Sequence, residues 1–341
     1  MTYWRPIAMT DAARPRGALP LAGGPCWFDR VERLERGAPA CVRPAADLPP
    51  EIHDRLTAPR PAFGGLSMDR ARIMGILNVT PDSFSDGGRF LAPEAALAQA
   101  RAMVAEGAEI LDIGGESTRP GAAEVPVAEE ISRTAPVIAA LRAAGLTTPI
   151  SIDTRKGPVA EAALAAGASV INDVAALTHD PALASVAART GAPVILMHAQ
   201  GTPATMQRAP RYDDVLLDVY DWLAARIAAA EAAGIARDRL MVDPGIGFGK
   251  TLEHNLALIR GLSLFHGLGC PILLGASRKR FIGTIGGQEV AEQRMPGSLA
   301  VGLAGAAQGV QLLRVHDVGE TRQALALWQA ITTSNQTGDG A

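Results

Sequence analysis

From Arg72 onward, short apolar runs alternate with longer segments rich in Ala and Leu. The short runs have the length and composition of buried strands, and the longer segments have the apolar spacing of helices. Strands are predicted at 72–78, 109–113, 149–152, 169–173, 193–197, 240–243, 271–275 and 311–314. Helices are predicted at 93–106, 127–144, 157–166, 181–190, 213–233, 252–262, 293–308 and 317–332. Eight strand–helix units in about 270 residues predict an α/β protein with a (β/α)8 TIM barrel. A doubly wound open sheet is the alternative.

The first 70 residues lack this alternation and hold 10 of the 24 prolines. Phe28, Val31 and Leu34 are spaced as on one face of a helix, which predicts one short helix within 27–36. The rest of this segment is expected to be Pro-rich extended chain that packs on, or is tethered to, the main domain. The predicted organisation is an N-terminal extension at 1–70, a barrel at 71–335 and a tail at 336–341.

Composition narrows the class of protein. The chain is 48% hydrophobic, and its net charge of −3 with three Tyr excludes the basic, aromatic-lined surface that binds nucleic acid. No apolar stretch approaches the ~18 residues of a membrane span, and the N-terminus lacks the apolar core of a signal peptide. Cys26, Cys41 and Cys270 have no CxxC spacing, which favours reduced thiols and a cytoplasmic location.

Polar residues gather where the predicted strands end. The connections from helices back to strands, such as 166–168 and 191–193, consist of small residues without polar side chains. The loops after the strands contain the polar segments 78–88, 114–121, 153–156, 172–173, 197–198, 243–250, 277–280 and 314–317. Because the active sites of TIM barrels are built from the loops that follow the strands, this asymmetry predicts an enzyme.

The segment 240–250 is the most distinctive of these. An apolar strand leads into Asp243, which is followed by three glycines at alternate positions and by Lys250. Glycine permits unusual backbone angles and a close approach to a ligand. The segment is not a P-loop, because Pro244 stands where the first glycine would be, and its glycine spacing differs from the dinucleotide fingerprint. A polar-ligand site is predicted, and a plain tight turn with a solvated Lys is the alternative.

Only three of the 32 basic residues are lysines, namely Lys156, Lys250 and Lys279. In so Arg-rich a chain, a lysine marks a position where a compact point charge is preferred to a planar guanidinium. A functional role is therefore predicted for Lys250 and Lys279. For Lys156, chance and a place at the start of a helix are the alternative.

The strand-end residues divide into two chemical groups. Asp153, Asn172 and Asp243 offer carboxylates and an amide to a flat, nitrogen-rich heterocycle, because a buried carboxylate needs donor partners. Capping of the helices that follow is the alternative for these three residues. His198 follows a buried apolar run and is predicted to be a satisfied core residue.

The second group attracts anions and includes Thr118, Arg119, Lys279, Arg314 and His316. Arg314 and His316 alternate along one strand end and therefore point the same way, and together they suit a phosphate or diphosphate. Asn78 supplies an oxygen ligand for Mg²⁺, which binds through few protein oxygens plus substrate phosphates. No GxSxG, HExxH or His/Cys metal cluster is present. These residues favour a mechanism that stabilises a leaving group over one that uses a covalent nucleophile.

These motifs closely resemble those of the dihydropteroate synthase family of pterin-binding barrels. The resemblance covers about residues 70–332 and is carried by 75–88 (GILNVTPDSFSDGG), 115–121, 152–154, 171–173, 243–250 (DPGIGFGK), 277–279 and 314–317 (RVHD). It implies condensation of 6-hydroxymethyl-7,8-dihydropterin diphosphate with p-aminobenzoate, which gives 7,8-dihydropteroate and diphosphate for folate biosynthesis. It also implies Mg²⁺, a homodimer and a p-aminobenzoate pocket that sulfonamides target.

The resemblance assigns roles residue by residue. It implies that the dihydropterin is held by Asp153, Asn172, Asp243 and Lys279, in a pocket lined by Phe248, Gly249 and Lys250. It implies that Thr118, Arg314 and His316 hold the diphosphate, and that Asn78 contacts Mg²⁺. Asp153, Lys279, Arg314 and His316 are the predicted catalytic residues, and the loops 80–90 and 117–125 are the predicted mobile lids.

Three features depart from the family pattern. Ala199 stands where many members have Met, Arg280 stands where Ser is common near the p-aminobenzoate carboxylate, and the first 70 residues have no counterpart in the family core. Two alternative functions use the same barrel. One is a methyltetrahydrofolate–corrinoid methyltransferase, and the other is a non-catalytic paralogue that binds a pterin.

Overall fold

A computed structural model describes residues 1–79, 92–117, 121–201, 205–206 and 208–332. Eight parallel strands form one sheet in the order β11-β10-β9-β8-β7-β6-β13-β12, and a parallel bridge between Val242 and Ile272 joins its two edges. The strands are β6 (Arg72–Asn78), β7 (Ile110–Gly114), β8 (Ile150–Asp153), β9 (Val170–Asp173), β10 (Val194–Met197), β11 (Leu240–Asp243), β12 (Leu273–Leu274) and β13 (Leu312–Val315). The ring is therefore closed, which confirms the predicted barrel and excludes the open sheet.

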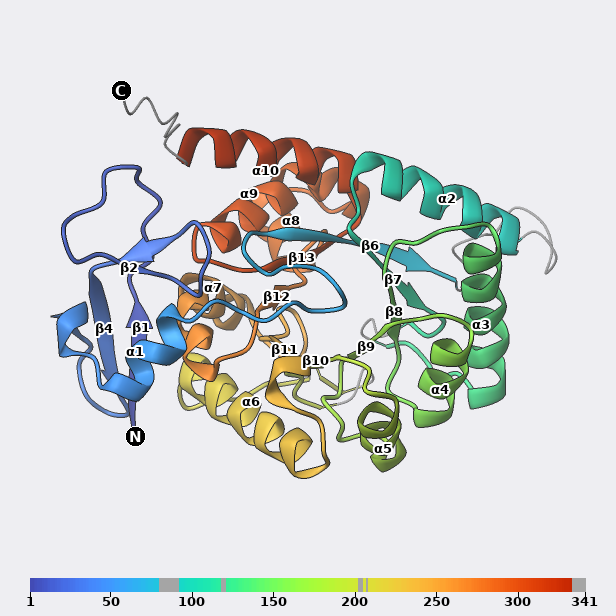
Figure 1. Ribbon diagram of the computed structural model, residues 1–341, viewed down its shortest axis with the longest axis horizontal. Helices are drawn as coiled ribbons and strands as arrows, with labels where there is room; N and C mark the ends of the chain where they lie inside the picture. Colours follow the sequence, from blue (N-terminus) through green and yellow to red (C-terminus); the bar gives the residue numbers. More distant parts are fainter. Residues whose placement is uncertain (80–91, 118–120, 202–204, 207, 333–341) are drawn as a thin grey trace, which may run out of the picture.

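Helices connect successive strands and cover the outside of the ring (Figure 1). They are α2 (Ala92–Glu106), α3 (Val127–Ala143), α4 (Gly157–Ala165), α5 (Pro181–Thr190), α6 (Val215–Ala232), α7 (Leu252–Arg260), α8 (Arg280–Gly286), α9 (Met295–Ala306) and α10 (Val318–Thr332), with a 3-10 helix η4 (Leu262–Leu268) before β12. The Asp214 carboxylate accepts from the amides of Leu216 and Leu217 and so fixes the start of α6. The sequence pattern missed α8, because seven residues are too few to show a helical period.

One end of the barrel is filled by a layer of apolar side chains. Seven of the eight strands contribute one each, namely Met74, Ile110, Val170, Ile195, Met241, Leu273 and Leu312. Phe63 and Met68, from the segment before β6, pack in the same layer and are 1% and 2% exposed. The chain that enters the barrel thus closes its amino-terminal end, and this floor leaves only the opposite end for a site.

The helix predicted within 27–36 is wrong. That segment forms β3 (Trp27–Phe28) and β4 (Arg30–Glu35), and β4 lies between β1 (Thr2–Pro6) and β5 (Cys41–Pro44) in an antiparallel sheet. Pairing with β1 supplies a ladder of backbone hydrogen bonds and an ion pair of 2.6 Å between Arg5 and Glu32. These long-range contacts outweigh an apolar spacing that involves only three side chains.

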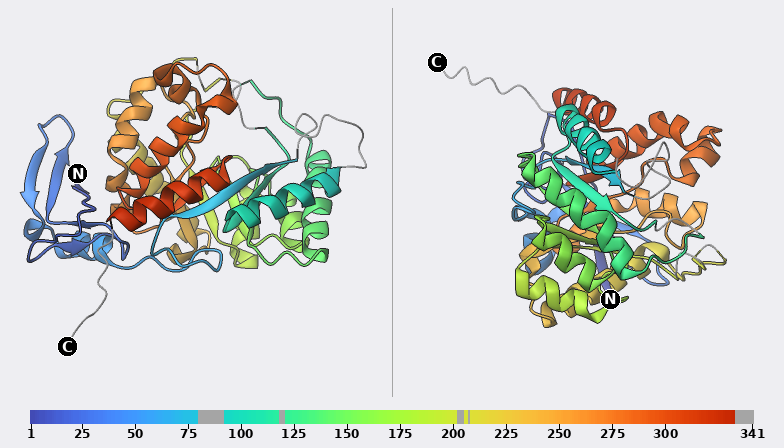
Figure 2. Two further views of the ribbon diagram at one scale, coloured as in Figure 1. Left: turned by 90° about the horizontal axis from the view of Figure 1, so that it is seen from above. Right: turned by 90° about the vertical axis from the view of Figure 1, so that its right-hand side faces the viewer.

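The N-terminal extension has a core of its own. Besides the sheet, it contains a hairpin of β2 (Leu19–Pro20) with β3 and a helix α1 (Pro50–Thr57). A buried cluster of Leu21, Cys26, Phe28, Val31, Ala45, Leu48 and Leu56 also contacts Trp328 of α10. The Tyr3 hydroxyl donates to Asp221 of α6 at 2.7 Å. The extension is therefore folded against the barrel. It lies at one end of the molecule, and β6 points towards the other end (Figure 1 and Figure 2, left).

Among the helices of the described ranges, none has the length and apolar character needed to cross a membrane.

Candidate active site

A polar layer lies directly above the apolar floor of the barrel. Side chains of a strand alternate between its two faces, so the residue two positions after a floor residue also points inward. In β7, β9, β11 and β13 that residue is Asp112, Asn172, Asp243 and Arg314, and in β8 Asp153 follows the buried Ser151 in the same way. Five neighbouring polar side chains therefore meet inside the carboxyl end of the ring, where TIM barrels place their active sites.

Arg314 binds two carboxylates of this layer. Its Nε donates to Asp112 at 2.5 Å and its Nη2 donates to Asp153 at 2.8 Å. The same oxygen of Asp112 accepts from the Asn172 amide at 3.1 Å. Asn172 and Asp153 are thus drawn into the barrel, and the helix-capping alternative does not apply to them. Asp173 instead accepts from the amides of Ala175 and Leu177 and shapes the loop after β9.

Two buried carboxylate oxygens of this layer have no hydrogen-bond partner among the described residues. They are Oδ1 of Asp112 and Oδ1 of Asp153. Burial raises the pKa of Asp153 to about 7, although Arg314 opposes this shift and Asp112 adds to it. Because an unpaired buried acceptor is costly, the layer is suited to a ligand that brings N–H donors.

Asp243 lies at the end of β11 and is 5% exposed. Its Oδ1 accepts from the Gly245 amide at 2.7 Å. Burial raises its pKa, whereas the nearby Lys279 lowers it. Gly245 has φ of 67°, and a Cβ there would lie 1.8 Å from the carbonyl oxygen of His198. The glycine is therefore required by the close approach of the loop after β10.

Lys279 joins this group from the loop after β12. Its ammonium donates to the Ile246 carbonyl and lies 4.3 Å from the centre of the Phe248 ring. Burial lowers the pKa of Lys279 to about 8, and Asp243 partly opposes the shift. An amine in this setting is a cation at neutral pH that sits beside an aromatic face.

Lys250 lies beneath the loop instead of at its surface. Its side chain is buried, and its Nζ is 2.9 Å from Nδ1 of His198 and 3.0 Å from the Phe248 carbonyl. Burial lowers the pKa of Lys250 well below its usual range and lowers that of His198 to about 2. The His198 ring also packs edge-on against Trp222 at 4.8 Å. The solvated lysine of the tight-turn alternative is wrong, and His198 is the satisfied core residue that the sequence predicts.

The loops after β12 and β13 are joined by two neighbouring contacts. Ser277 Oγ lies 3.0 Å from Nδ1 of His316, and the Arg278 guanidinium forms an ion pair with Asp317. Asn78 ends β6 and is aligned with Gly114 of β7, so it lies on the same rim of the barrel.

A second ion cluster, which the sequence analysis did not predict, is formed by Glu116, Glu130, Arg155 and Lys156. The Lys156 ammonium donates to Glu116 at 2.6 Å, to Glu130 at 2.8 Å and to the Val125 carbonyl at 2.5 Å. Glu116 in turn accepts from the Val125 amide at 2.8 Å and pairs with Arg155. Lys156 does stand at the start of a helix, as the N-cap of α4, but its side chain is buried and paired. It fastens the base of the loop that follows β7.

Asp112 was also missed. The available signal was a single carboxylate at an inward position of an otherwise apolar strand, Ile110–Gly114. Thr118 and Arg119 lie outside the described residues, as does the predicted lid at 80–90 and part of the predicted lid at 117–125.

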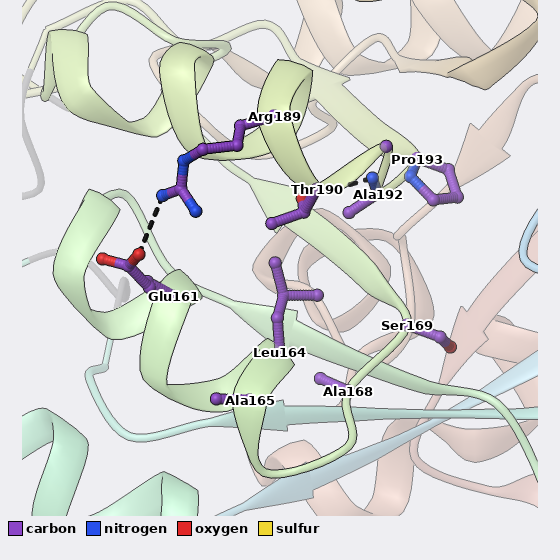
Figure 3. A pocket seen from close by; sticks show the side chains of 10 residues that line it. Glu161, Leu164, Ala165, Ala168, Ser169, Arg189, Thr190, Ala192 and Pro193 are labelled. Atoms are coloured by element: carbon purple, nitrogen blue, oxygen red, sulfur yellow. Dashed lines mark hydrogen bonds and ion pairs between the residues drawn. The ribbon is translucent and has the colours of Figure 1, made fainter.

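Two hollows open at the surface of the described residues. One of about 190 Å³ lies beside the barrel mouth and is lined by Val174, Ala199, Trp222 and Phe248 among others. The other, of about 520 Å³, lies between α4 and α5 near the start of β9 and β10, where an ion pair between Glu161 and Arg189 spans 2.8 Å (Figure 3). The larger hollow contains none of the polar layer and is at the opposite end of the strands.

Comparison with known proteins agrees with this geometry. The family model described as pterin binding enzyme matches residues 74–316. The dihydropteroate synthase of Escherichia coli (strain K12) is 47% identical over 271 residues, which cover 80% of this chain and 95% of that protein. A structure of the Xanthomonas albilineans dihydropteroate synthase with 4-aminobenzoic acid has a TM-score of 0.76 at 50% identity, and covers 81% of this chain and 99% of that one. Another, of the same enzyme with 7,8-dihydropteroate, has a TM-score of 0.72 at 48% identity, and covers 79% and 96%.

These matches confirm the synthase interpretation of the sequence motifs over the methyltransferase and non-catalytic alternatives. The chain belongs to the pterin-binding enzymes and, within them, to the dihydropteroate synthases, the transferases that make dihydropteroate for folate biosynthesis.

Proposed function

We propose that the polar layer of the barrel mouth binds the dihydropterin ring of 6-hydroxymethyl-7,8-dihydropterin diphosphate. The observation that carries this proposal is the pair of unpartnered carboxylate oxygens on Asp112 and Asp153. With Asn172 and Asp243, they offer acceptors to the N–H groups of the ring. Lys279 lies beside Asp243 and donates to acceptors of the same ring.

The mouth has room for a flat ring because two inward positions are glycines. A Cβ on Gly114 would lie 3.5 Å from Cβ of Asp153, and a Cβ on Gly275 would lie 3.5 Å from Oδ2 of Asp243. Side chains there would fill the space directly above both carboxylates. Phe248 supplies an aromatic surface at the edge of this space, where Lys279 already lies over its ring.

The diphosphate is assigned to Arg314 and His316, with Thr118 and Arg119 from the loop after β7. Arg314 keeps a guanidinium at the rim because Asp112 and Asp153 hold it there, and a guanidinium matches phosphate oxygens in shape and charge. A Mg²⁺ ion is consistent with Asn78 on this rim. Because Mg²⁺ is usually bound through few protein oxygens together with substrate phosphates, Asn78 would hold the ion jointly with the diphosphate of the substrate.

A Mg²⁺ ion held with the help of Asn78 would supply positive charge to the diphosphate. The bond between the exocyclic methylene carbon and the diphosphate oxygen breaks, and its electron pair leaves with the diphosphate. The lone pair of the p-aminobenzoate nitrogen then forms the new C–N bond, and that nitrogen loses a proton. Arg314 and His316 stabilise the charge that develops on the leaving group, while the polar layer holds the ring in place.

A homodimer is proposed because α9 has an unusually apolar surface. Its sequence MPGSLAVGLAGA has no charged residue, yet most of its positions are only partly buried in the single chain. A helix that is apolar all round is normally enclosed, and Ile285 and Val290 nearby are 60% and 50% exposed. A second copy would cover this surface. Light scattering that gives the mass of one 35.4 kDa chain at micromolar concentration would contradict the dimer.

A cytoplasmic location is proposed because all three cysteines are free. Cys26 and Cys270 are buried and Cys41 is exposed, so the structure contains no disulfide bond that an oxidising compartment would maintain.

The proposed division of roles is tested by measuring diphosphate release with Mg²⁺ and the dihydropterin diphosphate, with and without p-aminobenzoate. Release is expected only when the aryl amine is present, with dihydropteroate formed in equal amount.

Asp243→Asn keeps the shape of the side chain and removes its charge, and it is expected to abolish pterin binding in calorimetry. Diphosphate release without the amine, or unchanged pterin binding by this variant, would refute the assignment. Asp238→Asn is the matched control, because Asp238 is exposed on the outside of the barrel.

A further inference from the structure

We infer that Ser277 is a positioning residue for His316, because its hydroxyl donates to Nδ1 and so keeps the imidazole proton on Nε2. The inference deepens the proposed function, in which His316 binds the diphosphate, and it rests on that assignment.

The argument starts from the two hydrogen bonds of one hydroxyl group. Ser277 Oγ lies 3.2 Å from the backbone nitrogen of His316 and 3.0 Å from its Nδ1. The backbone N–H can only donate, so it takes one lone pair of the hydroxyl oxygen. The oxygen keeps a second lone pair, but if an Nδ1–H donated to it, the hydroxyl proton would have no acceptor among the described residues. Donation of the hydroxyl proton to Nδ1 satisfies both groups. A nitrogen that accepts this proton carries none itself, so the neutral ring is protonated at Nε2.

The position of Ser277 is fixed by the residue that follows it. Arg278 has φ of 58°, a left-handed backbone that is strained for a residue other than glycine. Its amide donates to Ser298 Oγ at 2.9 Å, its carbonyl accepts from Arg294 at 3.0 Å, and its guanidinium binds Asp317. These contacts hold the turn in its strained form. Ser277 with His316, and Arg278 with Asp317, are thus neighbouring links between the same two loops.

The tautomer matters because the proposed ligand is an anion. An Nε2–H group donates a hydrogen bond to a phosphate oxygen, whereas the other tautomer presents a lone pair to it. His316 follows Arg314 by two positions on β13, so the two donors lie on one face of the strand end. A fixed tautomer therefore prepares the diphosphate subsite before the substrate binds.

The tautomer can be measured directly by long-range ¹H–¹⁵N spectroscopy of the ¹⁵N-labelled protein at pH 8. The sequence has six histidines, and His316→Gln identifies the signals of His316 by their loss. The wild type is expected to show a protonated Nε2 and an unprotonated Nδ1. Ser277→Ala is expected to give a mixture of tautomers, whereas Ser277→Thr keeps the hydroxyl and the wild-type pattern. A protonated Nδ1 in the wild type would overturn the inference.

Kinetics provide an independent check. Losing the hydroxyl is expected to raise KM for the dihydropterin diphosphate by about 3- to 10-fold, the effect of a typical hydrogen bond. KM for p-aminobenzoate is expected to stay unchanged, which a general loss of structure would not produce. Ser132→Ala is the control, because Ser132 binds only a carbonyl on the exposed surface of α3.

The two ideas fail in different ways. If the wild type forms no dihydropteroate, the proposed function is wrong whatever the tautomer. If the wild type is active but Ser277→Ala changes neither the ¹⁵N shifts nor KM for the diphosphate, only the role of Ser277 is wrong.

Discussion

The carboxylate of Asp153 is expected to reduce the stability of the free enzyme above neutral pH. Burial raises its pKa from 3.8 to about 7, so between these values the folded protein holds a proton that the unfolded chain has lost. The free energy of unfolding therefore falls as pH rises through this window, and the loss is complete above pH 7. This rise in the pKa of Asp153 corresponds to at most about 4 kcal/mol of unfolding free energy.

Asp153→Asn removes this titration and keeps the shape of the side chain. The 2.8 Å bond from Arg314 is already included in this pKa, because Arg314 opposes the rise. The expectation is therefore a gain of up to about 4 kcal/mol in unfolding free energy at pH 8, with little change at pH 4. Pterin binding is expected to be lost, so the variant is more stable and inactive.

The assay is urea unfolding followed by tryptophan fluorescence at pH 4, 6 and 8. Asp173 and Asp243 also have raised pKa values, so the relevant quantity is the difference between variant and wild type at each pH. Asp238→Asn controls for the loss of a surface carboxylate. If Asp153→Asn is less stable at pH 8, and its difference from wild type does not change with pH, then Asp153 is a simple ion-pair partner of Arg314 and the reasoning is wrong.

Three further predictions concern the rim, the floor and the second ion cluster. Arg314→Lys keeps a cation for the buried carboxylates but loses the planar fork, so binding of the diphosphate substrate should weaken at least 10-fold while free pterin changes little in calorimetry; equal losses would make Arg314 structural. Phe63→Ala should cost about 3–5 kcal/mol in urea unfolding because it empties the barrel floor, whereas Val42→Ala, at 54% exposure, should cost under about 0.5 kcal/mol; similar costs would contradict the floor. Lys156→Met should cost about 3–5 kcal/mol because it leaves the buried Glu130 without its cation and Glu116 with Arg155 alone, and a neutral result would show that Glu130 becomes protonated.

The barrel could be predicted from the sequence because its signal is repeated. Each strand is a short apolar run, each is followed by a helical segment, and the polar residues fall on only one kind of loop. The same rule located Asp153, Asn172, Asp243 and Arg314, since each is the last or the next-to-last residue of a strand. Family resemblance then supplied the ligand, which the pattern of polar residues by itself did not specify beyond a heterocycle and an anion.

Other features depend on contacts that no local pattern encodes. Asp112 was missed because it lies in the middle of a strand, two residues before the end of β7. The sequence did not reveal that Lys250 lies under its own loop, where its amine contacts His198 and the Phe248 carbonyl. The strand β4 was missed because it pairs with Thr2–Pro6, which is distant enough in sequence that a local period cannot reveal it.

The placement of the three lysines has a practical consequence for chemical labelling. Lys156 and Lys250 are 5% and 3% exposed, which leaves Lys279 as the one lysine side chain that solvent reaches. With a pKa of about 8, a substantial fraction of its amine is unprotonated, and therefore nucleophilic, at mildly alkaline pH. Apart from the α-amino group, an acylating reagent should thus find a single target, and a ligand seated beside Asp243 should shield it. The rate of acylation then reports occupancy of the pocket without any enzymatic turnover.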